Sequence, residues 1–408
     1  MKLDWKESPE IRMYVCGITV YDYCHLGHAR TIIVFDVLRR LLKAKGFRLT
    51  HVQNFTDVDD KIIRKAKETG MSVREVAEKY TEAYFEDFER LNVERAEFYP
   101  RATEYIPTMH KIIKGLLDRG YAYVSKTGVY FDVPKFEGYG KLSKIRLEEL
   151  KVGARVEVDE FKKSPLDFAL WKFAEDEPLY PSPWGLGRPG WHIECSSMVW
   201  KLLGETIEIH GGGEDLIFPH HENEIAQSEA FTGKPLSKIW MHVGMLKLGA
   251  DKMSKSLGNI ITLKDAIPKW GPNSIRLFLL MKHYRAQLNL TEEGLRNASE
   301  NWKVIEEAAW NLLQPYGEED EKLISLALTY FDEFDERLSQ DLNTSTAIMA
   351  LLKLSKAITK AQAQRRLGER TAEEVGKYFF KMFEIMGLRL PEISEGERKE
   401  IEGLIAIR

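Results

Sequence analysis

The first 55 residues contain the pattern that most restricts how this chain folds. Residues 12–17 form a short apolar run, and residues 49–55 resume as a second strand-like segment. Between them lies a segment that ends at Gly46 and carries apolar residues at helical spacing, namely Val34, Leu38, Leu41 and Leu42. Two strands joined through a helix pair in parallel, so this β-α-β unit predicts a parallel sheet.

A second β-α unit occurs much later in the chain. Residues 206–210 have a strand pattern, three glycines follow, and a helix is expected from near Pro219 to near Gly233. The intervening residues, from about 99 to 183, break into short strands and turns, which indicates an insertion. Beyond residue 301 the segments are long and helically periodic. The predicted fold is α/β: a Rossmann-like parallel-sheet domain split by an insertion, followed by a C-terminal all-α helical bundle.

Composition limits the class of protein. The chain has 408 residues, 44% of them hydrophobic, which suits two to four folded domains and excludes a disordered chain. No apolar run is long enough to span a bilayer, and the N-terminus lacks a secretory signal, so we expect a soluble cytoplasmic protein without a membrane partner. Three cysteines are too few for a disulfide framework. A net charge of −4 gives no general attraction to nucleic acid, so such a partner would need local basic patches.

Two histidines at the start of the first expected helix are candidates for phosphate binding. In the motif Cys24-His-Leu-Gly-His28, Gly27 lets a ligand approach the backbone. The imidazoles of His25 and His28 can donate hydrogen bonds to phosphate oxygens, and the helix N-terminus favours negative charge. The motif alone is a weak signal, because the same histidines could be a loop pair with ordinary hydrogen bonds.

Two lysines form the second candidate. They belong to Lys252-Met-Ser-Lys-Ser256, a polar segment that precedes a helix-start signal at residues 262–265. Lys252 and Lys255 could close over a polyphosphate and neutralise the charge that develops on a leaving pyrophosphate. Taken alone, the segment could be a solvated charged turn. Together and in this order, the histidine and lysine motifs resemble the class I aminoacyl-tRNA synthetases.

A third set of residues could hold a metal ion. His220 and Glu224 stand four apart on an expected helix and share a face, while Cys16 ends the first strand and Cys195 lies in the later half of the sheet. Two thiolates, an imidazole and a carboxylate make a plausible tetrahedral zinc set. Spacing leaves this open, because distant cysteines are usually structural and His221 competes with His220 as a ligand.

Four stretches carry a narrower resemblance. Residues 13–30, 54–60, 190–195 and 210–227 are similar to the cysteinyl-tRNA synthetase family. In that family the matching residues bind one zinc ion and leave a position for the substrate thiolate; here they are Cys16, Cys195, His220 and Glu224. Cys24 does not match a zinc ligand, and we expect it to be a buried structural thiol.

The resemblance also implies a reaction. L-cysteine would be activated by ATP to cysteinyl adenylate, with Mg²⁺ accompanying the nucleotide, and the cysteinyl group would pass to the 3′-terminal ribose of tRNA(Cys). We expect the enzyme to act as a monomer. The residues implied in ATP binding and catalysis are His25, Gly27, His28, Lys252 and Lys255, of which Gly27 would only bind.

The same resemblance implies a pocket for the amino acid. The residues expected around bound cysteine are Gly17, Thr56, Trp191 and Asp215. Asp215 would pair with the ammonium group, and Trp191 would form a wall. Without the resemblance, Trp191 is better explained as a core residue and Asp215 as a helix cap.

The expected domains follow the family. They are the first half of the catalytic domain (1–98), an insertion or connective domain (99–185), the second catalytic half (186–245), the Lys-Met-Ser-Lys-Ser loop and stem-contact region (246–305) and a helical tRNA-binding domain (306–408). The last ends about where the family's basic anticodon-reading segment would begin, so we expect that segment to be lacking. Two other functions stay open: a cysteine ligase that joins activated cysteine to an aminosugar, and a non-catalytic zinc- or tRNA-binding paralogue.

Overall fold

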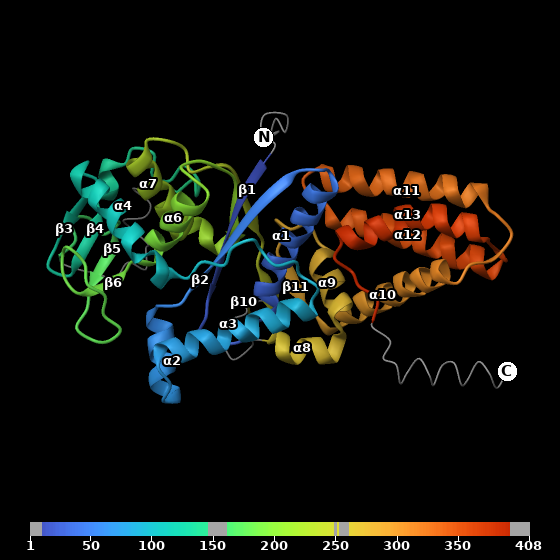
Figure 1. Ribbon diagram of the computed structural model, residues 1–408, viewed down its shortest axis with the longest axis horizontal. Coiled ribbons are helices and arrows are strands. Elements are labelled where there is room, and N and C mark those ends of the chain that lie inside the picture. Colours follow the sequence, from blue (N-terminus) through green and yellow to red (C-terminus); the bar gives the residue numbers. More distant parts are fainter. Residues whose placement is uncertain (1–9, 146–160, 249–250, 253–260, 392–408) are drawn as a thin grey trace. The chain divides into compact units, whose positions relative to one another are not determined.

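The chain divides into two compact units in the computed structural model, which describes residues 10–145, 161–248, 251–252 and 261–391 (Figure 1). The first unit comprises Met1–Lys269 and Lys282–Glu292, and the second comprises Trp270–Met281 and Glu293–Arg408. This division follows the packing of the chain, and the five-part functional division stays a prediction.

A four-stranded parallel sheet organises the first unit, as the sequence predicted. Its strand order is β2-β1-β7-β8, with every neighbouring pair parallel. The strands are β1 (Glu10–Thr19), β2 (Arg48–Thr56), β7 (Ile207–Gly213) and β8 (Ser237–Val243). Helix α1 (Leu26–Ala44) links β1 to β2, and α7 (Glu222–Thr232) lies between β7 and β8 in the sequence. Because β1 and β7 are the inner strands, their carboxyl ends meet near the middle of the sheet edge, where open α/β sheets bind ligands.

Local sequence signals explain where these helices begin and end. The side chain of His25 accepts hydrogen bonds from the first-turn amides of α1, so it acts as the N-cap. The helix α7 ends at Gly233, whose φ of 74° lies in the left-handed region that favours glycine. Strand β1 has an irregularity between Val15 and Ile18, where its register against β2 shifts. Such irregularities re-aim side chains beside functional sites, and this one falls on Cys16 and Gly17.

The insertion contains a helix that the sequence analysis did not predict. Residues from about 99 to 183 were expected to form short strands and turns, yet α4 (Ile106–Asp118) packs its apolar face into the core of this region. An antiparallel sheet of order β3-β4-β5-β6 completes the region. Its strands are β3 (Ala122–Val124), β4 (Gly128–Phe131), β5 (Phe168–Phe173) and β6 (Gly187–Pro189). The proline and glycine of α4 concealed an otherwise regular helical spacing of buried residues, namely Ile106, Met109, Ile112, Ile113 and Leu116.

The first unit contains further helices outside these β-α units. They are α2 (Asp60–Thr69), α3 (Val73–Arg90) and α6 (Trp191–Leu202). A small sheet of order β10-β9-β11 joins β9 (Leu246–Leu248), β10 (Asp251–Lys252) and β11 (Leu288–Leu290). Helix α8 (Leu263–Trp270) begins where predicted, with Asp265 N donating to Thr262 Oγ1 at 3.2 Å. Lys255 lies outside the described residues.

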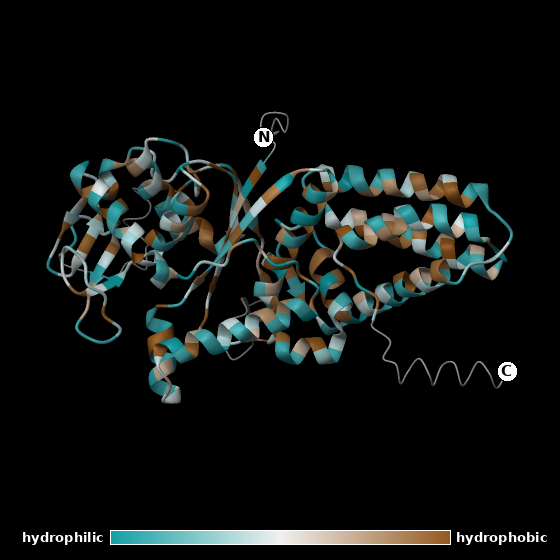
Figure 2. Ribbon diagram, viewed as in Figure 1, coloured by the Kyte–Doolittle hydropathy of each residue, from teal (hydrophilic) through white to brown (hydrophobic). Residues whose placement is uncertain are grey.

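The second unit is helical, as predicted. Its helices are α9 (Pro272–Leu280), α10 (Glu292–Leu313, whose first residue belongs to the first unit), α11 (Glu321–Ser339), α12 (Thr344–Ala363) and α13 (Glu369–Ile385). Figure 2 shows polar and apolar residues alternating along these helices, as expected for helices that bury one face each. Two-residue strands, β12 (Tyr316–Gly317) and β13 (Arg366–Leu367), pair antiparallel. Among the described residues, no helix is both long and apolar enough to cross a bilayer.

Candidate functional site

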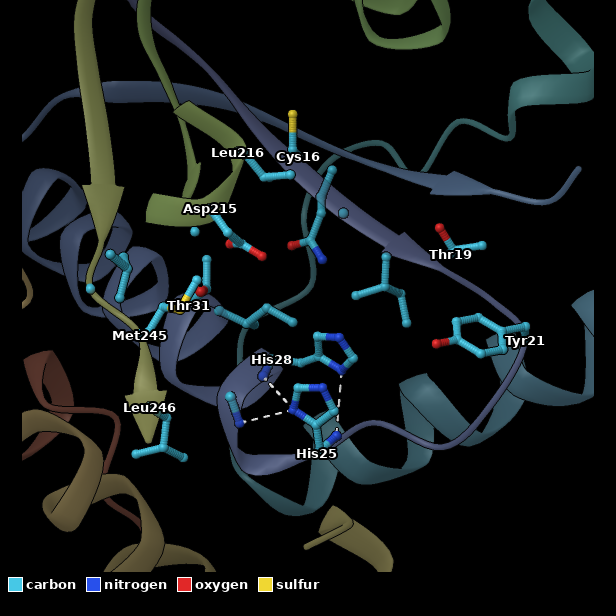
Figure 3. Close-up of a pocket in the computed structure, with 18 of the residues that line it drawn as sticks. Cys16, Thr19, Tyr21, His25, His28, Thr31, Asp215, Leu216, Met245 and Leu246 are labelled. Carbon is cyan, nitrogen blue, oxygen red and sulfur yellow. Dashed lines mark hydrogen bonds between the residues drawn. The ribbon is translucent and has the colours of Figure 1, made fainter. Parts of the chain in front are cut away.

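A cavity of about 290 Å³ opens at the carboxyl ends of the central strands. Its walls come from the ends of β1, β7 and β8 and from the first turn of α1. Figure 3 shows Cys16 at one end of the cavity and the stacked rings of His25 and His28 at the other, with Asp215 between them along one wall. The cavity therefore has two chemically different ends.

The histidine end is built by the first turn of α1. His25 Nδ1 accepts hydrogen bonds from the main-chain amides of Gly27 at 3.1 Å and His28 at 3.3 Å. The two imidazoles stack with centroids 3.6 Å apart. Both histidines line the cavity, as does Gly27. Because Nδ1 of His25 is an acceptor, its Nε2 carries the proton and can donate to an anion at the positive end of the helix.

The segment that follows the lysine motif is fastened to this histidine turn. The amide of Leu26 donates to Ile261 O at 3.2 Å, and the amide of Leu263 donates to Cys24 O at 2.8 Å. Main-chain hydrogen bonds thus join the histidine turn to residues 261–263, which follow the lysine motif in the chain. Lys252 closes β10, and the residues between it and Ile261, including Lys255, lie outside the described part of the chain.

Four potential metal ligands converge at the other end of the cavity. One donor atom from each of Cys16, Cys195, His220 and Glu224 lies within 4.8 Å of the others. Cys16 Sγ is 3.8 Å from Cys195 Sγ and 3.5 Å from Glu224 Oε1, and His220 Nε2 is 3.0 Å from the same oxygen. The sequence placed these residues in two distant halves of the sheet, and the fold brings them together.

The spacing of these atoms fits a tetrahedral zinc ion. With Zn–S bonds of about 2.3 Å and Zn–N or Zn–O bonds of about 2.0 Å, the tetrahedral edges are about 3.8 Å between sulfurs and about 3.3–3.5 Å between the other donors. The distances above lie close to these edges. Glu224 Oε2 is buried and makes no well-directed hydrogen bond within the described ranges, with only His210 Nε2 near it at 3.4 Å, so it has capacity left for a cation.

A second donor set overlaps the first. Cys16 and Glu224 also lie within 4.8 Å of donor atoms on His210 and His221. His221 Nε2 is 3.3 Å from Cys16 Sγ but 4.0 Å from Glu224 Oε1. The competition between His220 and His221 that the sequence indicated is therefore a real feature of the geometry, and only the set with His220 contains both thiols.

Mutual contacts fix the charges of the cluster. Burial lowers the pKa of His220, but Glu224 and Cys195 outweigh it and raise that pKa to about 10. Burial raises the pKa of Cys195, yet hydrogen bonds from Cys16 and His220 bring it down to about 6. The pKa of the Glu224 carboxyl lies well below its usual range because two histidines face it. The Cys195 thiolate and the Glu224 carboxylate are already in the forms that bind metals, whereas His220 and Cys16, whose thiol pKa is raised by burial, would each release a proton when a metal binds.

Two further histidines orient the imidazoles of the cluster. His192 Nδ1 lies 2.9 Å from His220 Nδ1, which leaves His220 Nε2 directed at Glu224. His242 Nε2 lies 2.8 Å from His221 Nδ1. Partners of this kind on the second ring nitrogen are usual for metal-binding histidines.

The residues expected around the amino acid occupy different positions. Gly17, Trp191 and Asp215 line the cavity, whereas Thr56 is not among the lining residues and donates its hydroxyl to Glu194 Oε2 at 2.8 Å. Trp191 is 40% exposed and stacks on His220 with centroids 4.2 Å apart. A Cβ at Gly17 would lie 1.7 Å from Asn54 O, so only glycine fits there.

Several residues of the site were not singled out from the sequence. Glu194 holds Thr56, and Asn54 Oδ1 accepts from the amide of Gly17 at 2.9 Å. Both lie inside stretches that carried the family resemblance, which was the available signal. The segment Val243–Leu246 lines the cavity without any motif of its own. Cys24 is buried and outside the donor cluster.

Comparisons with known proteins agree with this geometry. A family model described as the tRNA synthetases class I (C) catalytic domain matches residues 3–300, and a DALR domain model matches residues 333–391. The chain is 47% identical to the cysteine--tRNA ligase of Thermococcus onnurineus over 98% of this chain and 86% of that protein. It is 46% identical to the cysteine--tRNA ligase of Geobacillus thermodenitrificans over 98% of this chain and 87% of that protein.

Solved structures of the same fold include other synthetases. Mycobacterium tuberculosis methionyl-tRNA synthetase in complex with methionyl-adenylate aligns with a TM-score of 0.67 at 14% identity, covering 92% of this chain and 89% of that one. The Agrobacterium radiobacter K84 LeuRS in a ternary complex with tRNA and LeuAMS aligns with a TM-score of 0.67 at 10% identity, covering 93% and 84%. At these identities the likeness concerns the fold.

Proposed function

Because this chain belongs to the cysteine--tRNA ligases, a family of class I aminoacyl-tRNA synthetases, we propose that its cavity recognises cysteine through one zinc ion held by four side chains. The chain is a ligase of that family, which joins cysteine to tRNA. The proposed ligands are Cys16, Cys195, His220 and Glu224. The observation that carries the proposal is the near-tetrahedral spacing of their donor atoms at one end of the cavity.

The donor set accounts for selection of a thiol. A bound zinc ion would supply a site that prefers thiolate over hydroxyl, because zinc lowers the pKa of a coordinating thiol and binds the resulting thiolate strongly. Serine differs from cysteine by one atom, and a purely apolar pocket discriminates such pairs weakly. The chain's own part is to hold two thiolates, an imidazole and a carboxylate in place before substrate arrives.

Residues between the two ends would hold the rest of the amino acid. The Asp215 carboxylate lies on the wall between Cys16 and the histidines, which suits it to pair with the substrate ammonium group. Trp191 would form a wall beside His220. Gly17 lines the cavity and would face the amino acid with its main chain, and Thr56 would act through its hydrogen bond to Glu194.

The histidine end would bind ATP. His25 and His28 would donate to phosphate oxygens, Gly27 would leave room for them, and the α1 N-terminus would add its partial positive charge. The cysteine carboxylate would attack the α-phosphorus, and pyrophosphate would leave with Lys252 and Lys255 neutralising its charge, while Mg²⁺ accompanies the nucleotide. A terminal ribose hydroxyl of tRNA(Cys) would then take the cysteinyl group and release AMP. The enzyme would act as a cytoplasmic monomer.

Metal analysis combined with two assays tests this proposal. We expect one zinc per chain, L-cysteine-dependent exchange of pyrophosphate into ATP, and charging of tRNA(Cys). A metal-free chain that still prefers cysteine over serine would contradict the zinc site. Exchange together with cysteinyl transfer to an aminosugar, and none to tRNA, would identify a different acceptor. Absence of cysteine-dependent exchange from zinc-loaded protein would indicate a non-catalytic paralogue.

A further inference from the structure

A buried arginine joins the histidine helix to a neighbouring segment of the cavity wall. Arg30 belongs to α1 and is only 1% exposed. Its Nη1 donates to Gly244 O at 2.6 Å and to Met245 O at 3.0 Å. Its Nη2 donates to Ala286 O at 2.5 Å and to His283 O at 3.4 Å. One guanidinium thus links α1 to two separate main-chain segments.

The first of these segments forms part of the cavity wall. Val243, Gly244, Met245 and Leu246 all line the cavity. Figure 3 shows Met245 and Leu246 on the same side of the cavity as Asp215 and Thr31. The segment leaves β8 and continues into β9, which pairs with β10 and thus leads to the lysine motif. Two of the residues bound by Arg30, Gly244 and Met245, therefore stand shortly before the lysine motif in the chain.

Other contacts fix the same wall from its opposite side. Glu214 Oε1 accepts from the amide of Met245 at 2.9 Å and faces Gln287 Nε2 at 3.4 Å. A Cβ at Gly244 would lie 2.7 Å from both Ala286 O and Arg285 O, so the wall is pressed against the 283–286 segment. The carbonyls of the wall are held by Arg30, and an amide is held by Glu214. Every one of these groups belongs to the first unit.

The chemistry of arginine explains why this residue stands there. A guanidinium is planar and directs several donors along fixed axes, so it can satisfy carbonyls of two segments at once. Lysine presents its donors at a single nitrogen and lacks that fork. A buried charge stays favourable only while it is hydrogen-bonded, so the four carbonyls and the arginine hold one another in a single arrangement.

We propose that Arg30 is a positioning residue for the nucleotide: with Glu214 it sets the distance between the wall 243–246 and the histidine turn that would hold the ATP phosphates. This inference rests on the proposed function. It assigns Arg30 no contact with the reacting atoms. Its effect falls on ATP and spares the metal end, because Arg30 makes none of its four hydrogen bonds to the residues of the donor cluster.

The test compares Arg30→Lys and Arg30→Gln with a matched control, Arg12→Gln. Arg12 also donates to a main-chain carbonyl, Leu203 O at 2.8 Å, and pairs with Glu208, but it is near the start of β1 and does not line the cavity. Zinc content, thermal unfolding, and the KM values for ATP and cysteine in pyrophosphate exchange are measured for each. We expect the KM for ATP to rise at least tenfold in both Arg30 variants, with bound zinc and the KM for cysteine changed less than twofold. Arg12→Gln should lower the unfolding temperature without separating the two KM values.

A second variant covers the case in which Arg30 variants do not fold. Glu214→Ala releases the Met245 amide and leaves Arg30 in place, and we expect a three- to tenfold rise in the KM for ATP with zinc content unchanged. Equal changes in both KM values, or loss of zinc in step with the ATP effect, would overturn the positioning role. Failure of the unaltered, zinc-loaded chain to catalyse cysteine-dependent exchange would instead refute the proposed function, so the two failures are distinguishable.

Discussion

The two ends of the cavity differ in how far their charges are settled before any ligand binds. At the cysteine end, Cys195, His220 and Glu224 are almost fully buried, and Cys16 reaches the cavity with 9% of its surface exposed. Burial and the contacts of these groups with one another together set the pKa values of Cys195, His220 and Glu224. At the histidine end, His25 and His28 are half-buried and sit at a helix N-terminus. The groups of the cysteine end thus contact one another, whereas His25 and His28 face the cavity.

This difference predicts that substitutions at the two ends will have different effects on binding and on rate. Each of the four proposed metal ligands is needed before the substrate binds, so the loss of one should remove metal binding and cysteine binding together. A group of the histidine or lysine motif meets a charge that grows as pyrophosphate leaves, so its loss should slow the reaction and spare the binding of zinc and cysteine. The predictions below test that division, beginning with the largest expected effect.

Cys16→Ser should abolish the cysteine end. A hydroxyl is a far poorer zinc ligand than a thiolate. We therefore expect zinc affinity to fall by more than about 100-fold, which exceeds the usual effect of losing a residue that only hydrogen-bonds to a metal ligand. Cysteine activation should be lost with it, as it should in His220→Ala. Zinc titration and pyrophosphate exchange measure the two effects. Cys24→Ser is the matched control, because Cys24 is buried but outside the cluster, and it should retain zinc. Full activity of metal-free Cys16→Ser would refute the assignment.

Lys255→Ala should produce the opposite pattern. Zinc content and cysteine binding should stay nearly unchanged, while adenylate formation slows by roughly 10²- to 10³-fold, because the lysine charge is needed only in the transition state. Single-turnover measurement of adenylate formation tests this, alongside equilibrium binding of cysteine. Lys269→Ala is the control: Lys269 lies on α8 and its Nζ is 3.6 Å from a carboxylate oxygen of Glu292, so its loss should leave the rate of adenylate formation near normal. Weaker cysteine binding with an unchanged rate would contradict the role of Lys255.

The parallel sheet and the helical C-terminal region could be predicted from sequence because they rest on local periodicity. The apolar runs at 12–17 and 49–55 and the glycines that end α1 and α7 are signals within one segment. Helix α4 was missed because its Pro107 and Gly115 act as breakers in a sequence pattern, although Pro is tolerated in the first turn. Local signals therefore predicted the main helices and strands and failed to predict α4, a helix that contains proline and glycine.

The site itself was only partly predictable. Motif resemblance indicated the four metal ligands, but their convergence depends on the pairing of β1 with β7. The place of Thr56 beside the substrate stays a prediction, and the hydrogen bond of its hydroxyl to Glu194 at 2.8 Å joins residues 138 positions apart, which no local pattern indicates. Arg30 had no signal beyond its place after the histidine motif, because its partners are main-chain carbonyls, which any sequence possesses. Contacts of that kind appear only when the chain is folded.

His25 allows capping and phosphate binding to be separated. Asparagine is a good N-cap, so His25→Asn should preserve the start of α1 while removing the ring nitrogen directed to an anion. We expect stability near that of the unaltered protein and a rate lower by roughly tenfold to 100-fold. His25→Ala should lose the same rate and about 1 kcal/mol of stability as well. Chemical denaturation and pyrophosphate exchange measure the two quantities. Equal stability of the two variants would show that the cap contributes little.

His51 and His220 are both buried histidines, and their pKa values are shifted in opposite directions. Both are buried, but His220 faces Glu224 and Cys195, whereas neither ring nitrogen of His51 has a hydrogen-bond partner among the residues described. Burial lowers the pKa of His51 to about 3, with Arg39 and Lys43 adding to the effect and Asp36 opposing it. The unfolded chain takes up this proton near its ordinary pKa of about 6.5, so the folded state loses stability as the pH falls below that value and keeps it above.

The effect of His51 is measurable as a difference between two pH curves. Between pH 8 and pH 5 the unaltered chain should lose about 2 kcal/mol more of its free energy of unfolding than His51→Leu does, since leucine binds no proton in either state. Urea denaturation at both pH values tests this, and the difference between the two proteins cancels the contributions of every other titrating group. At pH 8 the comparison gives the packing cost of the substitution alone, because His51 is neutral in both states there. Parallel curves would mean that His51 takes up its proton over the same pH range in the folded and unfolded chains, and that burial without a charged partner does not control its pKa.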